Sequence, residues 1–235
     1  MNLSKQNVQK TTNHLGILLD LIIYISVMFL IREVYFPSLN FLINGIFWTL
    51  TTLAVATWRM KARGYSWKDL GLKKPKSLKK TFLFAIIIFV AVVASIVIFN
   101  ILQDSFPVLN EPGAEATAKS SGAKFGNLKG NWLLFFSIMP IVLVESMLEE
   151  LLDRAFLITW FEKLFSKTGI ATILAVVIQA CIFGFRHSND ISERSITVAL
   201  IGLVMGIAYI KFDRNLWPII IAHCILNTMS MVERV

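Results

Sequence analysis

Charged residues are scarce in this sequence. Asp, Glu, Lys and Arg make up 16% of the 235 residues and 56% are hydrophobic, whereas ordinary globular chains carry about 25% charged residues. Apolar segments recur from residue 15 to the C-terminal end, and the mean hydropathy is +0.67. This composition excludes a soluble domain and predicts a polytopic membrane protein.

Cysteine is also rare, and β-type alternation is absent. The two cysteines, Cys181 and Cys224, both fall within apolar segments, so a disulfide framework is neither required nor indicated. The apolar runs are too long for barrel strands and do not alternate with polar residues. Because backbone groups cannot stay unpaired in lipid, we expect an all-α fold, a polytopic transmembrane helical bundle with about seven spans.

Seven segments approach the length of about 20 residues that a helix needs to cross the hydrocarbon layer. They are residues 15–31, 37–58, 81–103, 131–147, 168–185, 195–210 and 215–232. The third is uncharged and apolar on every face, as a helix surrounded by lipid should be.

Most cations lie between the predicted spans. The net charge of +8 needs no nucleic-acid partner, because residues 59–80 alone hold nine Lys and Arg. In total, 16 cations share the side of the N-terminus and 7 lie on the other side. The positive-inside tendency therefore predicts a cytoplasmic N-terminus and an external C-terminus. Membrane lipids are the expected partners, and the basic loop is also compatible with a contact to anionic headgroups.

Ionisable residues inside apolar helices are the informative exceptions, since each costs at least about 2.5 kcal/mol at the bilayer centre without a partner or water. The fourth apolar run continues into VESMLEELLDRAF. On a helix, Glu150 and Arg154 can pair, whereas Glu145, Glu149 and Asp153 form a neighbouring stripe. Such crowding favours Glu149 for proton transfer. The alternative interpretation is a solvated helix end at the cytoplasmic interface.

Two of the three histidines fall within or beside predicted spans. Phe183 and His187 share one face around the fifth span, and His223 and Asn227 share one face of the seventh. A single membrane histidine is more often structural than catalytic, but two of them together with a diacidic helix indicate a site. In contrast, we interpret Asp20 in the first span as a structural hydrogen-bonding residue.

Together these motifs resemble a known family. Glu-Glu-x-x-x-Arg, Phe-x-x-x-His and His-x-x-x-Asn occur in this order, over residues 137–229. They resemble the CPBP family of intramembrane proteases, which includes CAAX proteases, bacteriocin-processing enzymes and type II CAAX prenyl endopeptidases. We accordingly divide the chain into residues 1–130, with three spans, the basic loop and a mobile connector at 104–130, and residues 131–235, with four spans and the site.

The resemblance implies an intramembrane endopeptidase that hydrolyses a peptide bond in a membrane-associated peptide or protein. Glu149 would activate the water, His187 would hold it, and His223 with Asn227 would stabilise the oxyanion. The supporting residues would be Glu150, Arg154 and Phe183. In this family the site is reached mainly from the cytoplasmic side. Glu145 has no place in the family scheme.

The use of a metal stays open at this point. Glu149, His187 and His223 are candidate ligands that can complete a three-ligand Zn²⁺ site, and family members are often called metalloproteases. However, the HExxH motif is absent, and a metal-free glutamate mechanism uses the same residues. The expected cofactor is therefore none or Zn²⁺.

Two other functions compete with proteolysis. A non-catalytic bacteriocin-immunity or membrane scaffold protein would need the fold but not the chemistry of Glu149. A proton-coupled transporter would need a polar pathway across the bundle, which the uncharged third span disfavours. The expected location is the plasma membrane of a bacterium.

Overall fold

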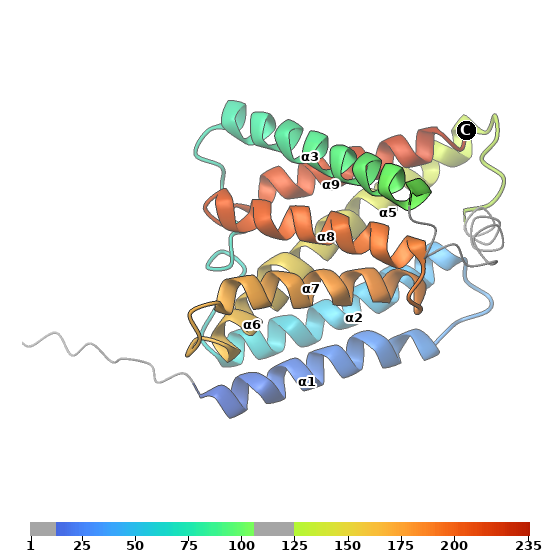
Figure 1. The fold of residues 1–235 in the computed structure, drawn as a ribbon. Coiled ribbons are helices and arrows are strands. Elements are labelled where there is room, and N and C mark those ends of the chain that lie inside the picture. Colours follow the sequence, from blue (N-terminus) through green and yellow to red (C-terminus); the bar gives the residue numbers. More distant parts are fainter. Residues whose placement is uncertain (1–12, 106–124) are drawn as a thin grey trace, which may run out of the picture.

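The computed structural model describes residues 13–105 and 125–235, and over these ranges it contains helices and no β-strand. The helices lie side by side in one bundle (Figure 1). The predicted all-α fold is therefore confirmed. The predicted mobile connector lies largely outside the described residues.

The helices differ in length and type. They are α1 (His14–Leu30), the 3₁₀ helix η1 (Ile31–Glu33), α2 (Phe41–Ala62), α3 (Leu78–Ser105), α5 (Trp132–Glu149), the π-helix η3 (Glu150–Ile158), α6 (Thr159–Leu164), α7 (Ala171–Ser188), α8 (Glu193–Lys211) and α9 (Leu216–Val232). Six helical stretches are long and apolar enough to cross a membrane, and α9 is a shorter apolar helix of 17 residues. About seven spans are consistent with this, and the chain is an integral membrane protein.

Several helices begin at a residue whose side chain caps the first turn. A backbone N–H two or three residues further on donates to the side-chain oxygen of Asn13, Asn40, Asn131, Ser192 and Asn215. The first N–H groups of a helix have no partner within the helix. These short polar side chains therefore fix where the helices start.

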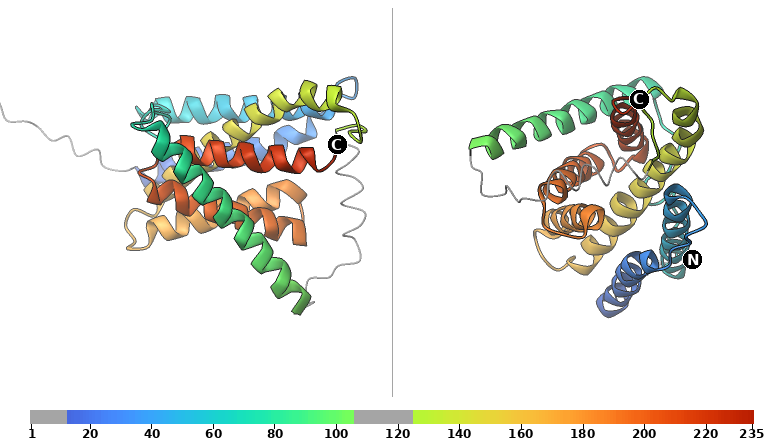
Figure 2. Two further views of the ribbon diagram at one scale, coloured as in Figure 1. Left: turned by 90° about the horizontal axis from the view of Figure 1, so that it is seen from above. Right: turned by 90° about the vertical axis from the view of Figure 1, so that its right-hand side faces the viewer.

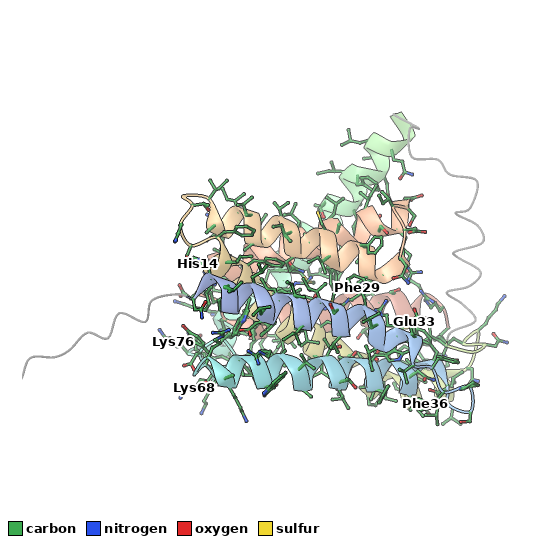
Figure 3. All side chains as sticks on the ribbon, turned by 90° about the horizontal axis from the view of Figure 1, so that it is seen from below. His14, Phe29, Glu33, Phe36, Lys68 and Lys76 are labelled. Atoms are coloured by element: carbon green, nitrogen blue, oxygen red, sulfur yellow. The ribbon has the colours of Figure 1, made fainter. Side chains whose placement is uncertain are left out.

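The described helices run between two ends of the bundle (Figure 1). The basic end holds the start of α1 and the lysine-rich segment 63–77, and the far end holds residues 34–40, residues 189–192 and the C-terminus. In Figure 3, His14, Lys68 and Lys76 lie at the basic end, and Glu33 and Phe36 lie at the far end.

The main core surrounds η3 and α6. All nine residues of η3 are buried. The ring of Phe156 stacks on that of Trp160 with centroids 4.3 Å apart and lies 4.7 Å from the ring of Tyr24 on α1. This aromatic packing joins the N-terminal helix to the middle of the chain.

Helix α3 has a protein face and a lipid face. Ala85, Ile88 and Val92 are buried, whereas Ile86 and Val90 are more than half exposed. Figure 2 shows α3 crossing the other helices obliquely, with its C-terminal part away from them. An apolar exposed face of this kind suits contact with lipid.

Asp20 is a structural residue, as predicted. Its buried carboxylate lies 2.6 Å from Arg59 Nη2 and 2.7 Å from Arg63 Nε, and the indole N–H of Trp160 donates to it over 3.2 Å. These contacts tie α1 to α2 and α6.

The predicted end of the fourth span is wrong. The chain stays helical without interruption over Trp132–Leu164, a stretch of 33 residues, instead of emerging near residue 147. Glu150, Asp153 and Arg154 are fully buried, which rules out the interpretation of this segment as a solvated helix end. Their burial is possible because each finds charged partners inside the bundle.

Candidate active site

The three motif helices meet around Glu149. This residue ends α5 and precedes the π-helix η3; π-helical turns are rare and are frequent at functional sites. Glu149 Oε1 lies 3.6 Å from His187 Nε2 at the end of α7, and Glu149 Oε2 lies 3.7 Å from His223 Nε2 on α9. The two imidazoles thus face the two oxygens of one carboxylate.

The ring orientation of His187 is set by its own helix. His187 Nδ1 lies 2.7 Å from the carbonyl oxygen of Phe183. Since a carbonyl oxygen only accepts hydrogen bonds, Nδ1 carries a proton and donates it. In neutral His187, Nε2 is therefore an acceptor that faces Glu149.

The second glutamate holds the second histidine. Glu150 is fully buried, and its Oε1 lies 2.7 Å from His223 Nδ1. Glu150 Oε2 lies 3.2 Å from Arg154 Nε, an ion-pair distance without hydrogen-bond geometry. The predicted contact between Glu150 and Arg154 is present, but the sequence did not indicate the contact with His223.

Phe183 packs against charged groups, as predicted for a packing residue. Its ring centroid lies 4.2 Å from the guanidinium carbon of Arg154 and 4.5 Å from the ring of His187. A guanidinium over an aromatic face is a favourable cation–π arrangement, stronger when desolvated. Phe183 therefore packs against both the buried Arg154 and the imidazole of His187.

Asn227 lies one turn beyond His223 on α9. Its side-chain amide donates to Ser146 Oγ over 2.8 Å, and Ser146 in turn donates to the carbonyl of Val142. This chain of hydrogen bonds fixes the amide against α5. Asn227 lines the same cavity as Glu149 and His223.

Two further charged residues belong to this cluster: Asp153, which the sequence placed on the stripe of Glu149, and Arg186, which was not predicted. Arg186 Nη2 lies 2.9 Å from Asp153 Oδ2 and 3.3 Å from Glu149 Oε1. The sequence-based boundary ended the fifth span at residue 185, whereas α7 continues to Ser188, so Arg186 was counted as a loop cation. The one feature of the sequence that could have identified Arg186 as a site residue is its position directly before His187.

Glu145 lies one turn before Glu149 and lines the same cavity. No hydrogen bond or ion pair of its side chain occurs among the described residues. Gly45 on α2 makes room for it, because a Cβ at this glycine would collide with Glu145 Oε1.

The cavity has a volume of about 700 Å³. Its wall includes Glu149, His187, His223 and Asn227, and its lining extends to Glu33, Asn189 and Arg234 at the far end. We expected both a cytoplasmic basic loop and a site reached from the cytoplasm. Because the cavity extends to the end opposite the basic loop, these two expectations cannot both hold.

The described side chains do not form a ready metal site. Over residues 13–105 and 125–235, no group of three or more His, Cys, Asp or Glu side chains has an arrangement that could hold a metal ion. Glu149 is paired with Arg186, and His223 Nδ1 is held by Glu150. Zinc binding would therefore require Glu149 to leave its cationic partner.

The helices and their buried acid–histidine cluster define an integral membrane protein with a polar cavity inside its helical bundle. Residues 131–229, which contain all the motif residues, match the family model described as Type II CAAX prenyl endopeptidase Rce1-like. This match, over 99 of the 235 residues, agrees with the family resemblance that the motifs indicated. No curated protein and no solved structure matches the chain.

Proposed function

We propose that this protein is an intramembrane endopeptidase in which Glu149 activates a water molecule for attack on a peptide carbonyl. The observation that carries the proposal is the placement of one carboxylate between two imidazoles, at 3.6 and 3.7 Å, in the wall of a cavity of about 700 Å³. A base within reach of a water and a dry, polar-lined pocket are what hydrolysis requires.

The two acceptors define how the water would be oriented. One water hydrogen points to Glu149 and the other to Nε2 of neutral His187, which leaves an oxygen lone pair directed at the substrate. Attack on the carbonyl carbon forms a C–O bond and transfers the water proton to Glu149. The carbonyl oxygen becomes the negative oxygen of a tetrahedral intermediate.

His223 and Asn227 would stabilise that oxygen. Because Glu150 accepts from His223 Nδ1, an imidazolium at His223 is balanced by the Glu150 carboxylate and presents Nε2–H to the oxyanion. Asn227 supplies, from the next turn, the amide N–H that does not donate to Ser146. Donors aimed at a developing charge in a dry site are among the largest contributions to catalysis.

Collapse of the intermediate completes the reaction. The C–N bond breaks, and Glu149 returns its proton to the leaving amine. The products are a carboxylic acid and an amine, which become a carboxylate and an ammonium group when the second water proton passes from the acid to the amine, and the site regains its starting protonation. The substrate class is a membrane-associated peptide or protein.

The test compares membranes from cells that carry the parent protein, Glu149→Gln or Glu145→Gln. Mass spectrometry of peptide termini should detect a new terminus in the parent and in Glu145→Gln, but not in Glu149→Gln. Glu145→Gln is a matched control, because it removes a carboxylate one turn away in the same cavity. If the terminus persists in Glu149→Gln, the glutamate mechanism is wrong. A cellular phenotype that survives this variant would favour immunity or scaffolding.

A further inference from the structure

Arg186 connects two helices at the point where the site is assembled. It is 5% exposed, and its Nη2 contacts both Asp153 and Glu149, which lie four residues apart on the continuous helix through η3. Arg186 directly precedes His187 on α7. The same turn of α7 therefore provides both the guanidinium that pairs with Glu149 and the imidazole that faces it.

The backbone of this turn is also held. A guanidinium nitrogen of Arg32, in the 3₁₀ helix η1, donates to the carbonyl oxygen of Arg186. Asn189 ends α7 in the left-handed conformation with φ 59°. The end of α7 is thereby fixed from two sides, so that displacement of Arg186 would move His187 with it.

Asp153 is the closer of the two partners of Arg186, at 2.9 Å against 3.3 Å for Glu149. The carboxylate of Asp153 thus takes the shorter contact of the guanidinium, and Glu149 is held at its Oε1 while its Oε2 faces His223. Without Asp153, the full positive charge of Arg186 would fall on Glu149 alone.

The ion pair between Asp153 and Arg186 is not one that is expected to stabilise the fold. Asp153 Oδ1 and Arg186 Nε are buried and have no hydrogen-bond partner among the described residues. A buried pair stabilises a protein only when the remaining polar atoms are satisfied, and an apolar pair of similar size is often as stable or more stable. A role other than stability is therefore the better explanation for two such costly residues.

We propose that Arg186 is a positioning residue that sets Glu149 and His187 relative to each other, and that Asp153 holds its charge in balance. This inference rests on the proposed endopeptidase function. A misplacement of reacting groups by about 1 Å can cost about 10²-fold in rate. Loss of Arg186 should therefore lower kcat, while KM changes little because the side chain need not touch the substrate.

The experiment uses the full-length protein in nanodiscs and a quenched fluorescent reporter peptide that spans the cleavage site identified by the comparison of peptide termini. Four proteins are compared with the parent: Arg186→Met, Arg186→Lys, Glu149→Gln and the double variant Arg186→Met with Asp153→Leu. Thermal stability and membrane level are measured beside kcat and KM. The single Arg186→Met variant leaves Asp153 without its nearest partner and should be less stable.

The double variant separates positioning from stability. It should be more stable than Arg186→Met, because Asp153 is no longer left without its nearest partner, yet its kcat should stay at least tenfold below the parent with KM within about threefold. Arg186→Lys keeps the charge but, as a single ammonium, cannot reproduce the planar guanidinium contacts, so its kcat should lie between those of the parent and Arg186→Met. Parental kcat in the double variant overturns the proposal.

The proposal can still be refuted if the double variant does not fold. If the double variant is absent from membranes, Arg186→Lys decides: parental kcat there refutes the positioning role. The proposed function is judged separately by Glu149→Gln. Full activity of that variant, or no cleavage by the parent protein, refutes the proposed function, whereas an inactive Glu149→Gln with fully active Arg186 variants refutes only the inference about Arg186.

Discussion

The imidazole of His223 is held between two consecutive glutamates, with Nδ1 2.7 Å from Glu150 Oε1 and Nε2 3.7 Å from Glu149 Oε2. One carboxylate fixes the ring, and the other faces its free nitrogen. The diacidic motif thus gives its two members different tasks, although they are neighbours in the sequence. Glu150 is fully buried, whereas the side chain of Glu149 is 22% exposed.

Glu150→Gln should lower both activity and stability. A glutamine can still accept from His223 Nδ1, but it no longer balances an imidazolium or the buried Arg154. We expect kcat to fall at least tenfold, and the free energy of unfolding to fall by about 3 kcal/mol, the lower bound for breaking a buried pair. The measurements are reporter-peptide kinetics and thermal unfolding in detergent. Parental kcat would refute the role of the Glu150 charge in balancing an imidazolium at His223.

Asn227→Ala should reduce kcat by about 10²- to 10³-fold, as removal of an oxyanion donor does. Ser146→Ala is its matched control: it removes the hydrogen-bond partner of the Asn227 amide but leaves the amide in place. We expect less than a tenfold change from Ser146→Ala. Steady-state kinetics of both variants test this prediction. An equal loss of kcat in the two variants would mean that activity requires the hydrogen bond between Asn227 and Ser146 and not the amide as an oxyanion donor.

Asp20→Asn should destabilise the bundle without a direct effect on the site. The variant leaves Arg59 and Arg63 without the carboxylate that both contact. Because the two arginines are partly exposed, water can compensate in part, so we expect a loss of about 3 kcal/mol or less. A lower melting temperature in nanodiscs, with unchanged KM in the surviving fraction, is the expected result. An unchanged melting temperature would show that these ion pairs contribute nothing measurable.

The orientation of the bundle can be measured with single cysteines. In a background with Cys181→Ser and Cys224→Ser, Lys76→Cys marks the basic end and Ser38→Cys marks the far end. The excess of cations around residues 59–80 predicts that a membrane-impermeant maleimide added to intact cells labels position 38 and not position 76. The reverse pattern would place the cavity on the cytoplasmic side.

The sequence predicted the helical class and the motif residues because both depend on local patterns. Apolar length identifies spans, and residues four apart on a helix share a face, which placed His223 beside Asn227 and Glu150 beside Arg154. These signals require no knowledge of which helices are neighbours.

The predicted span boundaries were wrong where charged residues lie inside the helical bundle. The fourth span was ended before Glu149 and the fifth before Arg186, because a hydropathy pattern treats a charged residue as exposed. Arg186 and Asp153 are 33 residues apart in the sequence and neutralise each other only after α7 packs against η3. The contact between His223 and Glu150 spans 73 residues and was hidden for the same reason.

The uninterrupted helical stretch Trp132–Leu164 has a consequence for the surrounding lipid. Its 33 residues correspond to roughly 50 Å at 1.5 Å per residue, against about 30 Å of hydrocarbon. Such a helix fits only by tilting, bending or local thickening of the bilayer. Glu149 lies near its midpoint, so the depth of this carboxylate below the headgroups varies with membrane thickness. For the proposed endopeptidase, acyl-chain length would then help to decide which peptide bond of an anchored substrate reaches this carboxylate.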